Sequence, residues 1–320
     1  MIIRKRFGNH TQLPTTIKEL EELSRKKSKK CTCSVCTPRT KSLNCILLFH
    51  STLPRNTTTN RFGNIVFAPP KLPSRTSRPV EGLYLVETIV EYFDRPPSHL
   101  NNDQLDALGI LCTFRDDHLG EILTPHPYPP YGHSWLRAPT MIHLWQSINT
   151  LFFGGPIPHA KFRWQEMKDT YGRAYHSGPL APTIVINHRL PPDNFGQYSI
   201  LAFLSVLIHE SIHVFLEYHA CQRCRSWRKD SKGEHGRHFQ TIAQKMEEVF
   251  PKLVGLPIDL GRLEGFLGDL GVGRGVVRKA LVPSVHDLEV WRFEDVKFLT
   301  NDEVRALVER IYAERYVNPI

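Results

Sequence analysis

Two histidines spaced four residues apart stand in the stretch IHESIH, residues 208–213. On an α-helix this spacing places His209 and His213 on one face, about 5.4 Å apart along the axis, so both imidazoles can reach one metal ion. Glu210 directly follows the first histidine and would lie beside that ion without being placed to bind it. The pattern therefore predicts a metal site whose neighbouring carboxylate can act as a general base on water.

His219 is one candidate for a third ligand, because it stands ten residues after His209. A histidine at that distance can return to the metal if a glycine breaks the helix between them. The residue at the position of that glycine is Leu216. On an unbroken helix His219 would lie about 240° round the axis from His213 and face away from the metal. We therefore interpret His219 as an ordinary histidine at the end of a helix.

His235, in the stretch GEHGRHF at residues 233–239, is a second candidate. The segment after it has apolar residues at helical spacing, so His235 would stand at the start of a second helix. Packed against the first helix, it would complete a site with three protein ligands and leave the fourth position to water, as in catalytic zinc sites. Glu234 is a rival, because carboxylates also bind zinc and spacing alone does not separate two neighbours on a loop.

The HExxH motif is typical of zinc peptidases, and its surroundings resemble the SprT-like (Spartan-like) zinc metalloproteases. In that family HExxH is followed, after a variable loop, by a GHG-x-x-F element. Residues 233–239 are similar to this element, with Glu234 in place of its first glycine. Upstream, residues 145–155 resemble the family's helix, and residues 161–167 and 183–190 resemble its strands.

The resemblance covers residues 136–250 and implies an α+β, zincin-like domain with a small sheet beside the HExxH helix. It implies that Zn²⁺ is bound by His209, His213 and His235, with Glu210 as the general base. The expected activity is that of a zinc-dependent endopeptidase acting on protein substrates. The resemblance extends that expectation to proteins associated with DNA or crosslinked to it.

The elements that would hold these residues can be outlined from the sequence. An apolar run at residues 199–208 leads into HExxH and predicts a buried helix. Another helix is expected to begin with a cap at Thr140 and to end at Gly154, where a left-handed backbone is available. An extended substrate could add a strand to the sheet edge at residues 183–187, a grip through backbone groups that tolerates many sequences.

The rest of the chain is expected to flank this unit. Residues 1–80 are rich in Lys, Arg, Ser, Thr and Pro, which predicts a basic tail that is largely disordered. Residues 81–135 predict a small helical or irregular segment that ends in a proline-rich linker. Residues 251–320 predict a C-terminal extension with a helix near residues 301–314.

The net charge of +9 indicates a polyanionic partner. Cationic residues recur in separate segments, which favours contact with DNA, although the basic run at residues 25–30 could equally be a nuclear import signal. The first residues lack the apolar stretch of a signal peptide, and no run reaches about 18 apolar residues. We therefore expect an intracellular, nuclear protein that is not secreted and does not span a membrane.

The cysteines do not predict a disulfide framework. There are seven, an odd number, and they include Cys31, Cys33, Cys36, Cys221 and Cys224. Two cysteines alone cannot complete a structural zinc site, so reduced thiols are expected throughout.

A rival function from another class is a non-catalytic protein in which zinc braces the helices and basic segments bind nucleic acid. Glu210 argues against it, because a structural zinc site has no need of a general base. Cleavage of a protein by the zinc-loaded chain would discriminate between the two.

Overall fold

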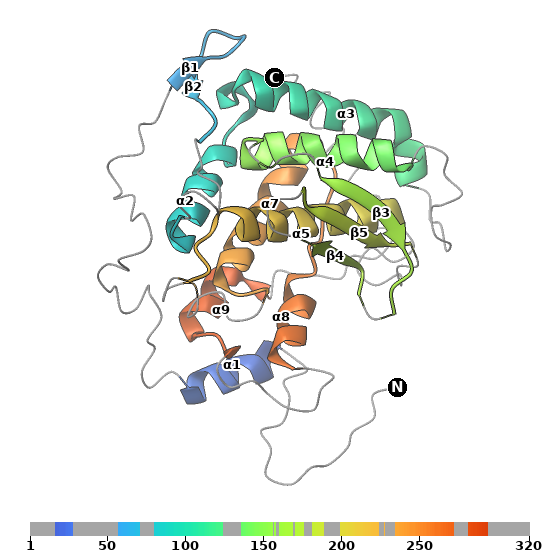
Figure 1. Cartoon of the computed structure of the whole chain (residues 1–320). Helices are drawn as coiled ribbons and strands as arrows, with labels where there is room; N and C mark the ends of the chain where they lie inside the picture. Colours follow the sequence, from blue (N-terminus) through green and yellow to red (C-terminus); the bar gives the residue numbers. More distant parts are fainter. Residues whose placement is uncertain are drawn as a thin grey trace.

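A computed structural model places helices and a three-stranded sheet at the centre of the protein, with short elements from both ends of the chain around them (Figure 1). It describes residues 17–27, 57–70, 80–123, 136–155, 157, 160–168, 170–175, 181–188, 199–223, 227, 234–271 and 281–293. The predicted linker at residues 125–133 and the predicted helix near residues 301–314 lie outside the described residues.

The described elements follow one another in this order: α1 (Ile17–Lys27), β1 (Thr57–Thr59), β2 (Ile65–Phe67), α2 (Gly82–Phe93), η2 (Pro97–His99), α3 (Asn102–Ile122), α4 (Ala138–Phe153), β3 (Lys161–Gln165), β4 (Gly172–Tyr175), β5 (Thr183–Asn187), α5 (Ser199–His219), α7 (Arg237–Val254), α8 (Arg262–Leu270) and α9 (Val285–Trp291). This mixture of helices and a small sheet confirms the α+β fold expected from the sequence.

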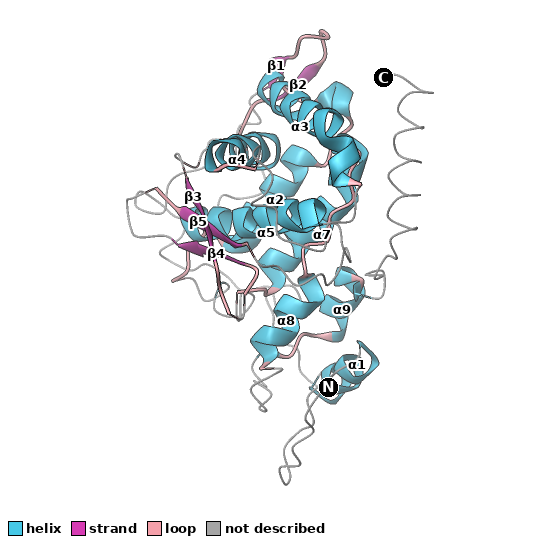
Figure 2. Ribbon diagram, turned by 90° about the vertical axis from the view of Figure 1, so that its right-hand side faces the viewer, coloured by secondary structure: helices cyan, strands magenta, loops and turns pink. Residues whose placement is uncertain are grey.

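The sheet lies on one side of α5 and α7 lies on the other (Figure 2). Side chains alternate between the two faces of a strand, and Ile184 and Ile186 of β5 are buried toward the helices. On α5, Phe203 meets Trp164 of β3 edge to face, with ring centroids 5.0 Å apart. The helix that carries HExxH is therefore held between the sheet and a second helix.

Helix α5 is apolar along most of its length. The window Ile200–His219 is long and apolar enough to cross a membrane, with a mean hydropathy of 1.6, although the sequence analysis expected no such segment. Within the protein 72% of this window is buried, as in a core helix. The apolar run is thus accounted for by burial on two sides, against the sheet and against α7.

The elements before the sheet differ in detail from the expectations. Helix α4 begins at Ala138 rather than with a cap at Thr140, and Pro139 in its first turn has no N–H that needs a partner. It ends at Gly154, which has a φ of 76°, as predicted. Helix α3 has 21 residues and begins with a reciprocal capping box between Asn101 and Gln104. The expected small helical segment is therefore a substantial part of the helical core.

The prediction that an extended substrate adds to a sheet edge at residues 183–187 is wrong. These residues form β5, which is the central strand, with β3 parallel on one side and β4 antiparallel on the other. Both rows of its backbone groups are paired, so no free edge remains there. Among the described residues, β4 is the edge strand that lies against α5.

Two parts of the expected N-terminal tail are folded. Helix α1 packs against α9 and buries Leu20 completely in a second apolar cluster, which also contains Phe266 and Leu270 of α8 and Trp291 of α9. Strands β1 and β2 form an antiparallel hairpin above the helical core (Figure 1). Since Leu20 of α1 lies in an apolar cluster formed mainly by the C-terminal extension, the two ends of the chain fold together.

Candidate metal centre

Three histidines from two elements converge on one point. Helix α5 carries His209 and His213 one turn apart, and His235 stands just before α7, whose N-cap is Gly236. The Nε2 atoms of His209 and His213 are 3.0 Å apart, and Nε2 of His235 lies 3.1 Å from the first and 3.3 Å from the second. Only this group of His, Cys, Asp or Glu side chains within the described part of the chain is arranged to hold a metal ion.

The spacing of the three nitrogens fits a single small cation. Tetrahedral ligands at about 2.0–2.1 Å from zinc lie roughly 3.3–3.4 Å from one another. Nδ1 of His209 lies 2.7 Å from the carbonyl oxygen of Leu260, and Nδ1 of His235 lies 3.3 Å from Oδ2 of Asp269. Because both oxygens can only accept, each Nδ1 carries the proton and each Nε2 presents its lone pair to the shared point. The donor set suits a divalent metal ion.

Burial keeps two of these imidazoles neutral. It lowers the pKa of His209 from 6.5 to about 3, with His235 adding a smaller effect in the same direction. Burial also lowers the pKa of His213 well below its usual value, and His209 and His235 contribute. A neutral imidazole is the form that binds a metal, so near neutral pH no proton has to leave before these nitrogens can act as ligands.

Phe239 forms the floor of the site. Its ring centroid lies 4.7 Å from the rings of both His209 and His213 and 4.9 Å from the ring of His235, and its side chain is buried. The first turn of α7 places it there, four residues after His235. The sequence analysis noted this phenylalanine only as part of a motif and gave it no role, although its place after the predicted ligand was a usable signal.

Glu210 lies beside the three histidines and is not one of them. It is 5% exposed, and a Cβ added to Gly172 of β4 would lie 2.7 Å from its Oε1. Burial raises the pKa of Glu210 from 4.5 to about 8, while the backbone N–H of Ala174, which donates to the carboxylate, lowers it and the charge of Glu234 raises it. The carboxyl group therefore has the raised proton affinity of a general base, and β4 fixes its position.

The two rejected ligand candidates lie elsewhere. His219 is buried at the end of α5 with its ring 5.2 Å from that of Phe215, and it is not part of the metal-binding group. Glu234 is exposed and is also outside the group, although its charge acts on Glu210. Of the three candidates for the third position, the structure brings only His235 to His209 and His213.

A network of hydrogen bonds from α7 and α8 surrounds the ligands. The backbone N–H of Leu260, whose carbonyl accepts from His209, donates to Glu247 at 2.9 Å, and Arg262 donates to the other oxygen of Glu247 at 2.6 Å. Nε2 of Gln240 donates to the carbonyl oxygens of both His235 and Arg262. One connected set of polar groups thus holds His209 and the backbone at His235 in place.

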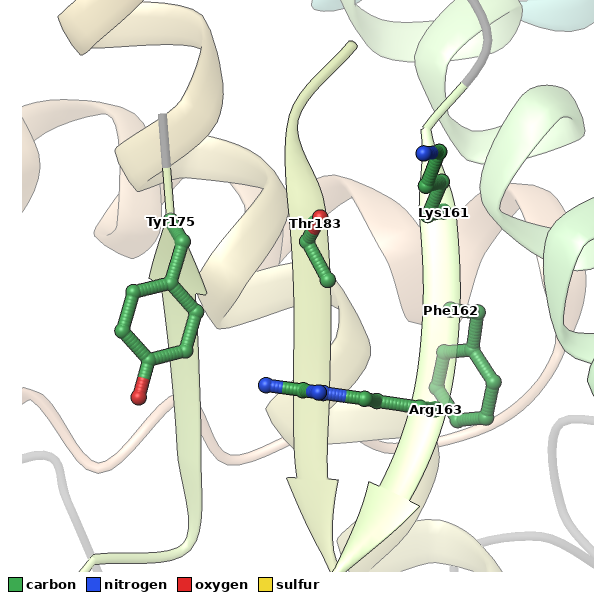
Figure 3. Close-up of a pocket in the computed structure, with 5 residues that line it drawn as sticks. All are labelled: Lys161, Phe162, Arg163, Tyr175 and Thr183. Carbon is green, nitrogen blue, oxygen red and sulfur yellow. The ribbon is translucent and has the colours of Figure 1, made fainter. Parts of the chain in front are cut away.

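The outer face of the sheet, which points away from α5, carries a pocket of about 360 Å³ (Figure 3). It is lined by Lys161, Phe162, Arg163, Tyr175 and Thr183. In Figure 3 the side chain of Arg163 extends across β5 toward β4, beside Thr183 and Tyr175. This pocket is separate from the three histidines, because those lie on the helical side of the sheet.

Comparison with known proteins agrees with the geometry of the site. Residues 141–260 match the SprT-like family. The match contains His209, Glu210, His213 and His235. Searches of curated proteins and of solved structures found no match.

Proposed function

Residues 141–260 form a SprT-like family domain, and from this premise we propose that the protein is a zinc-dependent endopeptidase. The family consists largely of metallopeptidases, and the three-histidine group can hold a metal ion. The observation that carries the proposal is the convergence of three Nε2 atoms within 3.0–3.3 Å beside a buried carboxylate that is not needed as a ligand. A structural zinc site would have no use for Glu210.

Each residue has a distinct part in the proposed hydrolysis. A zinc ion bound to the three Nε2 atoms would polarise the scissile carbonyl and lower the pKa of water. Glu210 takes a proton from the attacking water at its carboxylate and returns it to the nitrogen of the leaving amine. Ala174 and Gly172 keep this carboxylate in one orientation, so the proton acceptor does not have to be found by side-chain rotation.

The edge of β4 is the proposed place for the substrate. The N–H of Asn187 bonds to the carbonyl of Tyr171 at 2.7 Å, so hydrogen-bonded pairs with β5 fall on alternate residues of β4, beginning with Tyr171. The backbone groups of Gly172 and Ala174 consequently face the free edge. The N–H of Ala174 already serves Glu210, which leaves the backbone groups of Gly172 and the carbonyl of Ala174 for an extended peptide.

Nucleic acid is the proposed partner of the outer sheet face. Cross-strand pairing aligns Lys161, Thr183 and Tyr175 in one row, and Arg163 and Arg173 flank β5 in the next. No carboxylate occurs at the described strand positions of this face. Tyr175 is 39% exposed, so its ring is available for stacking with a base, while the three cations suit phosphates. A nuclear location stays a prediction from the basic run at residues 25–30.

The test uses the full chain loaded with zinc. Cleavage of an unfolded protein such as casein is measured with and without single-stranded DNA, and Glu210→Gln is the control that retains the proposed ligands. We expect cleavage by the wild-type chain only, and faster cleavage when DNA holds enzyme and substrate together. Equal, background-level cleavage by both chains at full zinc occupancy would instead favour the non-catalytic zinc-braced protein.

A further inference from the structure

Asp269 of α8 contacts His235 twice. Its Oδ2 accepts from the backbone N–H of His235 at 2.8 Å and from Nδ1 of the ring at 3.3 Å. One oxygen therefore fixes both the backbone of the loop and the tautomer of the ring, which leaves the lone pair of Nε2 directed at His209 and His213. Asp269 lies outside the residues that match the family, 141–260.

Gly265, one turn earlier on α8, lies against the other side of the contact. A Cβ at this position would lie 2.8 Å from Cδ2 of His235 and 2.9 Å from both Cγ and Nε2 of its ring. Real Cβ atoms do not approach a ring so closely, so only glycine lets α8 lie this near. The helix thus touches the imidazole through its backbone at Gly265 and through the Asp269 carboxylate.

Helix α8 is itself fixed in position. Arg262 in its first turn donates to Glu247 of α7 at 2.6 Å and to the carbonyl of Trp291 at 2.7 Å. Phe266 and Leu270 are buried in the second apolar cluster, which α1 and α9 complete. The surface that meets His235 is therefore held by packing on its opposite side rather than by His235 itself.

We propose that α8 is a positioning element for the third metal ligand, with Asp269 as the positioning residue and Gly265 as the close-packing contact. A histidine ligand whose second nitrogen is held by a carboxylate is a stronger and better oriented donor, and loss of such a partner typically weakens metal binding about 10- to 100-fold. The functional unit then extends past residue 260 to at least residue 271. The inference rests on the proposed role of His235 as a metal ligand.

The test measures affinity for Zn²⁺ and Co²⁺ by competition with a chelator in the full chain. Asp269→Ala and Gly265→Ala should each weaken binding about 10- to 100-fold, and His235→Ala should weaken it more. Gly268→Ala is the matched control: it lies on the same helix, a Cβ there would meet nothing within 4 Å, and it should bind as the wild type does. The folded fraction of each variant is checked by its circular dichroism.

A spectroscopic measurement separates positioning from general loss of stability. Asp269→Ala should shift the visible absorption bands of bound Co²⁺, because these report the orientation and donor strength of the ligands. Asp287→Asn, which weakens the ion pair that links α9 to Arg237 of α7, is expected to lower the melting temperature without changing those bands. Wild-type affinity and spectrum in Asp269→Ala would overturn the inference while leaving the metal site intact. Unchanged affinity in His235→Ala would instead overturn the ligand assignment itself.

Discussion

Gly172 of β4 and Glu210 of α5 lie in direct contact: a Cβ on Gly172 would come within 2.7 Å of Oε1 and 2.9 Å of Cγ of the glutamate. It would also meet Cγ1 of Val206 at 2.6 Å. A glycine inside a strand often marks such a close approach. The edge strand and the proposed catalytic carboxylate are therefore fitted to one another, and a single methyl group is enough to separate them.

Gly172→Ala should consequently lower the rate of cleavage while the metal stays bound. Displacing a catalytic group by about 1 Å can cost roughly 10²-fold in rate, whereas the three histidines are not touched by this change. The measurement is kcat alongside metal content. Gly109→Ala on α3, where a Cβ would meet nothing within 4 Å, provides the control and should cleave normally. Equal rates in both variants would mean that Gly172 does not set the position of Glu210.

His209→Ala, His213→Ala and His235→Ala should each reduce the zinc content per folded chain, because each removes one of three converging nitrogens. His219→Ala should not, since His219 packs beside Phe215 and is outside that group. Because His219 is buried, its variant is expected to lose stability, so metal analysis is made on the folded fraction only. A loss of zinc in His219→Ala with retention in His235→Ala would reverse the assignment.

Glu210→Gln should retain zinc and lose cleavage. The amide is nearly isosteric with the carboxylate and can still accept from the N–H of Ala174, but it cannot take a proton near neutral pH. Loss of a general base typically lowers the rate about 10²- to 10⁴-fold. Rates and metal content are measured on the same preparation. If this variant loses its zinc, Glu210 helps to build the site and its separation from the ligands is wrong.

The sequence predicted those parts of the site that depend on local spacing. His209, Glu210 and His213 follow from helix geometry alone, and His235 follows from a motif with its glycine and phenylalanine. The contact residues Asp269 and Gly172 could not be predicted in this way, because they come from elements 34 and 38 residues away along the chain, and no local pattern records such a meeting.

The sheet shows the same limit. The apolar pattern of residues 183–187 correctly predicted a strand, yet a run buried on both faces is more typical of a central strand than of an edge. Strand order depends on pairing between distant segments, and the weak strand β4 was not identified. The expected tail likewise concealed α1, because Leu20 is buried only after α8 and α9 have formed.

Charge on the outer sheet face can be tested without deleting residues 1–80, a change that would also remove Leu20 from the second cluster. Arg163→Glu should weaken binding to single-stranded DNA and reduce the salt dependence by about 0.7 per lost phosphate contact in a plot of log affinity against log salt. Lys252→Glu makes the same change of charge on α7 and should leave both quantities nearly unchanged. Equal losses in the two variants would indicate a nonspecific effect of net charge.

His238 predicts how the folded state responds to acid. Its ring is fully buried, lies parallel to Trp227 with centroids 4.8 Å apart, and is packed on Gly82, where a Cβ would meet Nε2 at 2.5 Å. Burial, and to a smaller extent the charge of Arg237, lowers the pKa of His238 from 6.5 to about 3. Between these two values the unfolded chain binds a proton that the folded chain does not.

The free energy of unfolding should therefore fall as pH decreases from 6.5 toward 3, with a slope from this residue of up to about 1.4 kcal/mol per pH unit. Above pH 6.5 the contribution is constant, because both states are neutral. His238→Gln removes the titrating group, so its denaturation curves at pH 6 and pH 4.5 should differ less than those of the wild type, with both proteins free of metal so that His209 and His213 contribute equally. The same pH dependence in both proteins would show that His238 can take up its proton without unfolding, and that the contact with Trp227 opens more readily than its burial indicates.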